Sequence, residues 1–487
     1  MGGLVDYTFT KIDFWLNGTR IQDEIPPGQS TFDYLHRKLQ LHGTKCSCNE
    51  GDCGACTVAI GSAREGAIVY EAVNSCLFPA ARLHRKHLIT IESLGTPDAL
   101  HPIQEAMLNH HATQCGYCSP GFVMSAFALL AMKPKPSRDE FLAALEGNLC
   151  RCTGYDSILK AMLELGAKGI DPVPAWARKI EPELFSIKTE PQYLQQKSDA
   201  IYPACKYLLP QSLEQLFAFW SDHPAAVPIC GGTDIMVQVN ISRRKFPALL
   251  DLTQIPELRS IKLQRDGLHI GATATYSDVY NSGIVKTDYP CFASLIRLIA
   301  SEQIRNSGSI VGNIANASPI GDSLPLLLVL EASLVLQSTD SQRTIPLKDF
   351  FLSYRKTALQ PFEIIREIII PPLPIDAFVR ISKAAKRKSV DISTIASAIR
   401  IELDSAGQIT KSLLAYGGAA AVPMLSFSAP SDMTGKRPSD IDFPKLASQI
   451  AAEFTPISDV RGSADYRKQL IANQVIGYLT ELSGRNK

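Results

Sequence analysis

The distribution of cysteine constrains this chain more than any other feature of its sequence. Nine of its 12 cysteines lie within the first 152 of 487 residues. Eight of these nine fall into two sets of four, and each set has a spacing that is typical of the thiolate ligands of iron–sulfur clusters. We therefore expect the N-terminal third to fold around two such clusters and the chain to carry electrons.

The first set combines a close triplet with one distant cysteine. The triplet is Cys48, Cys53 and Cys56, spaced C-x4-C-x2-C, and the fourth member is Cys76. This is the spacing of plant-type [2Fe–2S] sites. Cys46 is a surplus thiol, because only Cys48 lies the required distance before Cys53. Glycines inside the triplet allow backbone N–H groups to approach the sulfide of a cluster closely.

The second set pairs a C-x2-C with a C-x-C about thirty residues later. Its members are Cys115, Cys118, Cys150 and Cys152, and they can hold a second [2Fe–2S] cluster. A structural zinc ion is an alternative, but paired zinc ligands are mostly separated by two to four residues. Disulfides are a further alternative, although the first ten residues lack the basic segment and apolar core of a secretory signal. We expect a reducing compartment, the cytoplasm.

Composition excludes several classes of function. The hydrophobic content of 45% allows three or four domains, each with its own core. Lys and Arg total 49 against 48 Asp and Glu, a net charge of +1, so neither nucleic acid nor an anionic membrane surface is an expected partner. The longest apolar stretches, residues 122–132 and 324–336, are too short or too interrupted to span a bilayer. We expect a soluble protein.

Residues 1–93 have the order of elements found in plant-type ferredoxins. Two strands at 12–16 and 20–25 flank Asn17-Gly18, a strong hairpin signal. A helix capped by Thr31 then leads to the cysteine triplet, and an apolar strand at 57–60 follows it. Hairpin, helix and cluster loop in this order resemble the β-grasp fold.

Residues 94–170 are expected to form a helical domain, because residues 101 to about 166 have the 3.6-residue period of helices and Ser137 to Glu140 form a capping box. Each cysteine pair of the second set is expected near a helix start, where free N–H groups stabilise anionic sulfur. Residues 171–200 contain four prolines and no clear period, which indicates a surface linker.

The third region, residues 201–376, contains two further segments of note. The first is an apolar strand followed by a Gly-Gly-Thr turn, residues 229–235, whose N–H groups and hydroxyl suit phosphate. The second is residues 304–322. Together they resemble the FAD-binding stretches of the vanillyl-alcohol-oxidase and PCMH-type flavoproteins. No Gly-x-Gly-x-x-Gly follows a strand, so a Rossmann domain is not indicated.

The order of these parts resembles the molybdenum hydroxylases, and the fused arrangement is similar to the small subunit of bacterial xanthine dehydrogenases. The motifs E-G-D-C-G-A-C-T, Q-C-G-Y-C-S-P-G and N-L-C-R-C-T-G-Y carry the resemblance, which covers nearly the whole chain. Residues 377–487 are similar to the C-terminal part of the CO dehydrogenase flavoprotein. The implied fold class is α+β multidomain: a β-grasp ferredoxin domain, a helical [2Fe–2S] domain, a PCMH-type FAD domain and an α/β C-terminal domain.

The resemblance also implies the flavin contacts. Carried over position by position they are Cys230, Gly231, Gly232, Thr233, Asp234, Ile235, Ile299, Ser309, Ile310, Val311, Gly312, Asn313, Asp322, Ile365 and Lys383. Ile299 departs from relatives that have an aromatic residue beside the flavin. No side chain of this chain is expected to act as a catalytic acid, base or nucleophile, because the cofactors supply the chemistry.

The function implied is electron transfer in purine oxidation, from hypoxanthine to xanthine to urate. A partner large subunit would bind molybdenum through molybdopterin, in a heterotetramer of two small and two large chains. Electrons would pass from molybdenum through two [2Fe–2S] clusters to FAD and then to NAD. Two alternatives are the corresponding subunit of a molybdenum hydroxylase acting on an aldehyde or another N-heterocycle, and a stand-alone iron–sulfur flavoprotein carrier.

Overall fold

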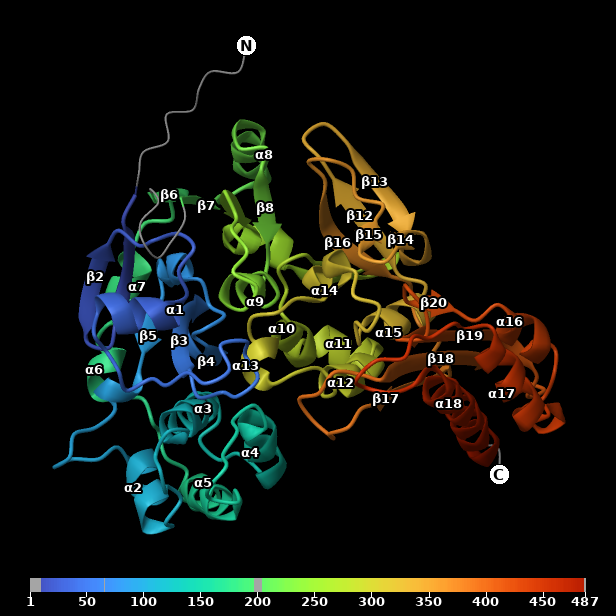
Figure 1. Cartoon of the computed structure of the whole chain (residues 1–487), viewed down its shortest axis with the longest axis horizontal. Helices are drawn as coiled ribbons and strands as arrows, with labels where there is room; N and C mark the ends of the chain where they lie inside the picture. Colours follow the sequence, from blue (N-terminus) through green and yellow to red (C-terminus); the bar gives the residue numbers. More distant parts are fainter. Residues whose placement is uncertain (1–9, 65, 197–203, 486–487) are drawn as a thin grey trace. The chain divides into compact units, whose positions relative to one another are not determined.

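The computed structural model describes residues 10–64, 66–196 and 204–485, which fold as an α+β chain of several domains (Figure 1). These residues divide into two compact units. Unit 1 comprises residues up to Pro256 together with Ser301–Gly308, and unit 2 comprises Glu257–Ala300 and Ser309–Lys487. The short segment 301–308 thus interrupts unit 2 in the sequence but belongs to unit 1.

Unit 1 begins with a five-stranded sheet in the order β2-β1-β5-β3-β4. Its strands are β1 (Ile12–Leu16), β2 (Thr19–Asp23), β3 (Thr57–Arg64), β4 (Ala67–Asn74) and β5 (His87–Ile89). The predicted hairpin is confirmed, with Asn17 at φ 54° in its turn. The helical segment consists of α1 (Thr31–Asp33) and a π-turn at Tyr34–Lys38. Thr31 was predicted to cap it, but Ser30 is the cap, because its hydroxyl accepts from the Asp33 N–H.

Four helices follow, as the 3.6-residue period predicts, and in Figure 1 they form a group beside the sheet. They are α2 (Pro102–Asn109), α3 (Ser119–Met132), α4 (Arg138–Leu145) and α5 (Asp156–Lys168). The predicted capping box from Ser137 to Glu140 is present at the start of α4. Helix α3 is apolar on all sides because it is central: it packs on β3 and β4 and also contacts α2 and α4.

The segment after α5 is more regular than a linker. It forms α6 (Ala175–Arg178), α7 (Glu181–Ser186) and β6 (Gln192–Gln196). Ile180, Leu184 and Ile187 are buried against Trp15 of the first strand. Each stretch is too short for its period to be visible among the prolines, but burial of these side chains holds the segment on the sheet.

A second sheet of unit 1 has the order β6-β7-β9-β8, and β7, β9 and β8 run parallel. Its remaining elements are β7 (Cys205–Leu209), α8 (Leu213–Asp222), β8 (Ala226–Ile229), α9 (Ile235–Asn240), β9 (Ala248–Asp251) and, from the inserted segment, α13 (Glu302–Arg305). The predicted Gly-Gly-Thr turn lies between β8 and α9. It therefore occupies the carboxyl end of a parallel strand, where ligands of open sheets bind.

The described residues of unit 2 form three further sheets. The first, β10-β11-β16-β12-β13, is antiparallel and is accompanied by short helices; the second is β17-β18-β19-β20, against which α16 to α18 lie (Figure 1); the third is the two-stranded β14-β15. The strands are β10 (Ile261–Gln264), β11 (Gly267–Gly271), β12 (Ser333–Gln337), β13 (Gln342–Pro346), β14 (Phe351–Ser353), β15 (Lys356–Thr357), β16 (Ile364–Ile370), β17 (Phe378–Ala384), β18 (Ile395–Leu403), β19 (Ile409–Gly417) and β20 (Met424–Leu425). The helices are α10 (Tyr276–Asn281), α11 (Gly283–Asp288), α12 (Cys291–Ile296), α14 (Ile310–Asn316), α15 (Leu324–Val329), α16 (Ser428–Met433), α17 (Phe443–Ala452) and α18 (Ala464–Arg485).

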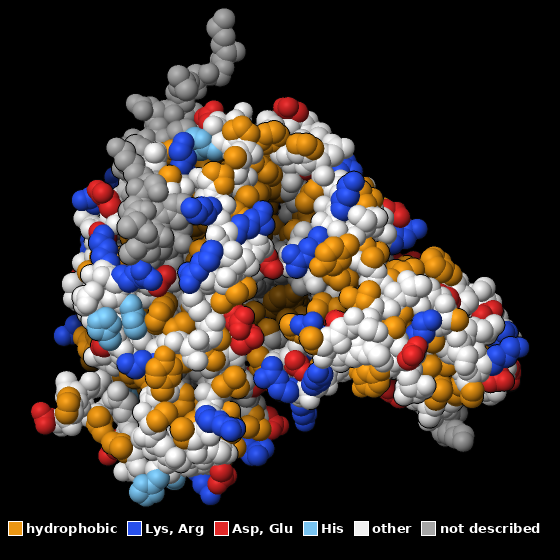
Figure 2. Space-filling model, viewed as in Figure 1, with side chains coloured by type: hydrophobic (Ala, Val, Ile, Leu, Met, Phe, Trp, Pro, Cys, Tyr) orange, Lys and Arg blue, Asp and Glu red, His pale blue; other side chains and the backbone are white. Residues whose placement is uncertain are grey.

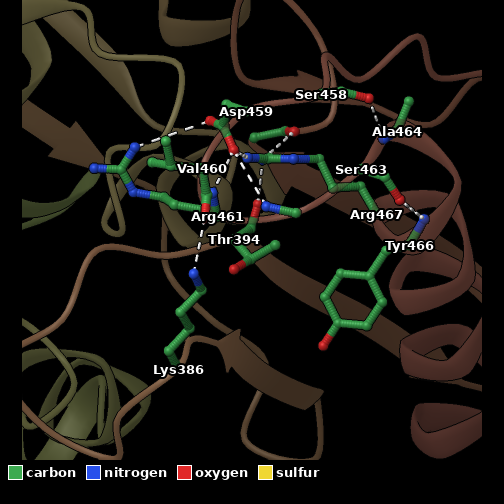
Figure 3. Close-up of polar contacts among 12 residues, drawn as sticks. Lys386, Thr394, Ser458, Asp459, Val460, Arg461, Ser463, Ala464, Tyr466 and Arg467 are labelled. Atoms are coloured by element: carbon green, nitrogen blue, oxygen red, sulfur yellow. Dashed lines mark hydrogen bonds and ion pairs between the residues drawn. The ribbon is translucent and has the colours of Figure 1, made fainter.

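One buried arginine joins the start of α18 to the second sheet of unit 2 (Figure 3). Arg467 is 2% exposed and donates to the carbonyls of Thr394 and Gly418, at 2.5 and 3.1 Å, and to Asp459 at 2.8 Å. Burial works against ionisation of Asp459, but hydrogen bonds from the Arg461 N–H and the Arg467 guanidinium lower the pKa of this carboxyl. Arg467 thus ties the loop before α18 to the start of β18 and to the end of β19.

The surface agrees with the balanced composition. On the face shown in Figure 2, Lys and Arg side chains are interspersed with Asp and Glu. Among the residues that the structure describes, no helix combines the length and the apolar character that crossing a bilayer requires.

Candidate functional site

The first cysteine set converges as two pairs of thiols. The Sγ atoms of Cys56 and Cys76 lie 3.2 Å apart and both residues are buried, while Cys48 and Cys53 are in hydrogen-bond contact with each other. A binuclear cluster needs four thiolates, two for each iron. The arrangement of two pairs therefore fits a [2Fe–2S] cluster.

The thiols of Cys48 and Cys53 differ in acidity. A hydrogen bond between them lowers the pKa of Cys53 to about 6, and the same contact raises that of Cys48. Cluster ligands bind as thiolates, so loading this site releases protons.

Two glycines of the triplet loop have conformations and neighbours that exclude a side chain. Gly51 has φ 87° and Gly54 has φ 66°. A Cβ atom on Gly54 would lie 2.4 Å from the carbonyl oxygen of Gly147, and one on Gly51 would lie 2.5 Å from Leu77. Asn74 donates to the Gly51 carbonyl at 2.8 Å and holds the loop in place. The loop therefore requires glycine at both positions.

The second cysteine set also converges as two pairs. Cys115 and Cys152 lie with their Sγ atoms 3.6 Å apart, and Cys118 contacts Cys150. Cys118 is the N-cap of α3, as expected for a site that stabilises anionic sulfur at a helix start. Burial, followed by the contact with Cys150, raises the pKa of Cys118 to about 12. Cys115 and Cys152 are exposed, so this set lies at the surface of unit 1.

The two cysteine sets are in direct contact through the backbone. Leu149, which precedes Cys150, donates its N–H to the carbonyl of Cys53 at 2.9 Å. Asn148 is buried and donates to the Gly54 carbonyl at 3.0 Å. These contacts join residues more than 90 positions apart, and no local pattern in the sequence indicated them.

A small polar network supports this contact. The Oδ1 atom of Asn148 accepts from Ser125 at 2.8 Å and from Gln303 at 3.0 Å, and all three side chains are buried. Gln303 belongs to the inserted segment 301–308, so that segment packs on the junction of the two cysteine sets. These hydrogen bonds hold the three buried side chains against one another at the junction.

The other four cysteines are in varied environments. Cys205 is buried, and burial raises its pKa to about 12. Cys230 and Cys291 are partly exposed. Cys46 lies beside the Cys56–Cys76 pair.

The first predicted flavin segment, residues 230–235, is shaped by its glycines. A Cβ atom on Gly231 would lie 2.3 Å from the carbonyl oxygen of Ser307, and Gly232 has φ 78°. Ser307 and Gly308 lie within the second predicted segment, residues 304–322, directly before its predicted flavin contacts 309–313. Only glycine therefore allows the backbone of this loop to lie so close to the backbone of residues 307–308. Phosphate binding by backbone N–H groups also requires a loop without obstructing side chains.

A buried arginine of the ferredoxin-like domain holds this loop. Arg82 is 4% exposed and donates to the Gly231 carbonyl at 2.7 Å and to the Cys230 carbonyl. It also forms an ion pair with Asp251, which is fully buried and accepts from the Tyr207 hydroxyl. Burial opposes the charge of Arg82, but the Asp251 carboxylate raises its pKa. A lone arginine among apolar residues carries no motif, so sequence analysis missed it.

Helix α9 connects the same loop to the first cysteine set. It begins at Ile235, directly after the Gly-Gly-Thr-Asp turn, and Met236 packs against Cys56 and Cys76. At its other end Asn240 donates to the Cys76 carbonyl at 2.8 Å. The predicted phosphate loop and α9 thus form one continuous element, and the far end of α9 contacts the predicted cluster ligand Cys76.

Unit 2 brings together several of the other predicted flavin residues. Asp322 accepts from Lys383 at 2.7 Å and also from Ser393. Its neighbour Ser323 donates to Asn313 at 2.6 Å. Ser309 caps α14 by accepting from the Gly312 N–H at 3.0 Å, and the three residues 310–312 form its first turn.

Two predicted flavin residues of unit 2 are apolar. Ile299 is 8% exposed and follows Leu298, whose carbonyl accepts from Lys383 at 2.8 Å. Ile365 is buried on β16, opposite Leu336. Lys386, in the loop after β17, donates to the Val460 carbonyl at 2.8 Å (Figure 3).

Four family models match the chain in order. They are the 2Fe-2S iron-sulfur cluster binding domain (residues 14–80), the [2Fe-2S] binding domain (90–163), the FAD binding domain in molybdopterin dehydrogenase (203–373) and the CO dehydrogenase flavoprotein C-terminal domain (380–482). The chain therefore contains two [2Fe–2S] domains, an FAD domain and a flavoprotein C-terminal domain. The chemistry and pairing of the eight thiols, and the glycine-lined loop, fit these groups.

Several known proteins are similar to the chain. Xanthine dehydrogenase of Emericella nidulans is 32% identical over 88% of this chain, and xanthine dehydrogenase/oxidase of Gallus gallus is 30% identical over 88%. The chain spans about 35% and 37% of those relatives' own lengths. A solved carbon monoxide dehydrogenase chain from Hydrogenophaga pseudoflava, from an enzyme lacking the Mo-pyranopterin moiety of its molybdenum cofactor, matches 57% of this chain and 96% of its own. That match has 27% identity and a TM-score of 0.53.

Proposed function

The chain belongs to the molybdenum hydroxylase family as an electron-transferring iron–sulfur and flavin component, and we propose that it is the small subunit of a xanthine dehydrogenase. In this proposal it receives electrons from a molybdenum centre on a partner and delivers them to NAD. When bound, the clusters carry single electrons and the flavin exchanges a hydride with the nicotinamide.

The observation that carries this proposal is the continuous contact from one predicted cofactor site to the next. Leu149 joins Cys150 of the second cysteine set to Cys53 of the first, through a 2.9 Å hydrogen bond. Asn240 joins Cys76 to α9, which starts at the predicted phosphate loop. A protein that only stored iron or bound flavin would have no need for this order of contacts.

Exposure of the second cysteine set supports a partner at that end of the path. Cys115 and Cys152 are exposed, and large apolar or aromatic side chains near them are also exposed: Tyr117 (47%), Leu149 (42%) and Tyr155 (44%). Exposed apolar surface around an electron-entry site is typical of an interface. We propose that a molybdopterin-binding large subunit covers it, in a heterotetramer of two small and two large chains.

This chain matches little more than a third of the length of each xanthine dehydrogenase relative. Xanthine as substrate is proposed from those relatives' names, and NAD as acceptor is proposed from the resemblance of the sequence to the molybdenum hydroxylases. The alternative favoured by the likeness to carbon monoxide dehydrogenase is the same electron-transfer role beside a different molybdenum subunit.

Native co-purification tests the proposal. The complex is purified from its own cell, its iron, flavin and molybdenum are measured, and its activity is assayed with hypoxanthine, xanthine, an aldehyde and a quinoline. A stoichiometric molybdenum subunit with xanthine:NAD activity is expected. Activity only with the other substrates would favour the alternative, and a monomer active without molybdenum would refute both.

A further inference from the structure

The surplus thiol of the first cysteine loop lies inside the predicted cluster site. Cys46 packs against Cys56 and Cys76 and is in hydrogen-bond contact with both thiols. Cys48 and Cys53 instead contact each other. The five thiols of the ferredoxin-like domain thus divide into an outer pair and an inner group of three.

Hydrogen bonds on both sides hold Cys46 in this position. Its carbonyl accepts from the Tyr117 hydroxyl at 2.7 Å, a contact supplied by the second cysteine set. Asn240 donates to the carbonyls of Asn49 and Cys76, at 3.1 and 2.8 Å, and so ties the Cys46–Asn49 segment to the strand end that carries Cys76. The contact of Cys46 with the inner pair is therefore built into the fold rather than left to a free loop.

We propose that Cys46 is a reserve ligand for the ferredoxin-like cluster, confined to the iron that Cys56 and Cys76 hold. The proposal rests on the proposed function only in that a [2Fe–2S] cluster binds here. If Cys56 or Cys76 is lost, the Cys46 thiol gives its proton to solvent and forms one iron–sulfur bond in place of the one removed, without electron transfer. Cys46 is not expected to serve the other iron, because Cys48 and Cys53 contact each other and Cys46 contacts Cys56 and Cys76.

The test compares alanine variants of the full chain, since serine oxygen can itself ligate iron. Cys56→Ala and Cys76→Ala should each keep both EPR signals and an iron content within about a fifth of wild type. Adding Cys46→Ala to either should remove the ferredoxin-like signal and about half of the iron. Cys48→Ala should lose that signal whether or not Cys46 is present.

The EPR signal of the second cluster serves as the folding control in every variant. Both Cys56→Ala and Cys76→Ala are made, so that the test remains valid if one of the two variants fails to fold. Loss of the ferredoxin-like signal in both Cys56→Ala and Cys76→Ala, with the second signal intact, would overturn the proposal. Retention of the signal in the double variants would overturn it equally. Wild-type protein without any cluster would instead refute the proposed function, so the two failures are distinguishable.

Discussion

The backbone N–H of Leu149 donates to the carbonyl oxygen of Cys53 across 2.9 Å, and this single bond joins the two cysteine sets of the chain. The approach is possible because glycine lines the junction. A Cβ atom on Gly121 would lie 2.3 Å from the carbonyl oxygen of Gly54, although Gly121 is in the first turn of a helix. Glycine stabilises a helix less than alanine does, but at this position it allows the two cysteine sets to lie close together.

Gly121→Ala should therefore destabilise the chain and weaken magnetic coupling between the reduced clusters. On helix propensity alone the change would stabilise by up to ~1 kcal/mol, so a lower unfolding temperature reports the clash. Gly477→Ala in α18 is the matched control, because nothing lies within 4 Å of its added methyl group. Equal behaviour of the two variants in thermal unfolding and EPR would contradict the role given to Gly121.

Arg82→Lys should lose FAD while keeping iron. Lysine preserves the charge opposite Asp251, but it lacks the planar fork that reaches both Asp251 and the carbonyls of Cys230 and Gly231. Flavin fluorescence and iron content of the purified chain check this. Arg37→Lys is the control, since Arg37 forms a surface pair with Asp33 that contributes little. Stoichiometric FAD in the Arg82 variant would show that the guanidinium does not position the loop.

Asp322→Asn should lower flavin affinity by an order of magnitude or more without changing either cluster. The carboxylate binds Lys383 and Ser393, and its neighbour Ser323 binds Asn313. Replacing it leaves the buried Lys383 ammonium without its counter-charge. Equilibrium dialysis against FAD measures the effect, with the exposed Asp340→Asn as control. Unchanged affinity would remove Asp322 and Lys383 from the flavin site.

Much of the site follows from local chemistry in the sequence, because cluster ligands come as short cysteine motifs and the spacing of each motif is itself the signal. The contacts of Leu149, Asn240 and Arg82 could not be predicted, because each joins residues between 90 and 170 positions apart. Thr31 was predicted to cap the first helix, but Ser30 is the cap; both residue types are good caps, and only backbone geometry distinguishes them. The segment after α5 looked like a linker because its structure depends on burial against Trp15.

The free energy of unfolding should fall in mild acid because of His87. Its ring is buried, with Nδ1 2.9 Å from the Tyr70 hydroxyl and Nε2 2.7 Å from the Asn17 carbonyl. Burial lowers its pKa to about 4 from an ordinary value of 6.5. The unfolded chain therefore takes up the proton first as the pH falls. This stabilisation is complete above pH 6.5 and is lost on the way to pH 4, at most on the order of 3 kcal/mol.

His87→Gln tests this, because glutamine can make both hydrogen bonds without titrating. Its thermal unfolding midpoint should fall less than that of wild type between pH 7.5 and pH 5. Parallel curves for the two proteins would mean that His87 does not cause the acid sensitivity.

An anaerobic reductive titration of the purified chain, followed by absorption and EPR, measures its electron capacity directly. Each [2Fe–2S] cluster accepts one electron and FAD accepts two, so eight paired thiols and one flavin site predict four electrons per chain, with two distinct EPR signals. The FAD should leave the protein on denaturation, because no attachment residue for covalent flavin stands out in the sequence. A capacity of two electrons, or one EPR signal, would contradict an electron path made of two clusters and a flavin.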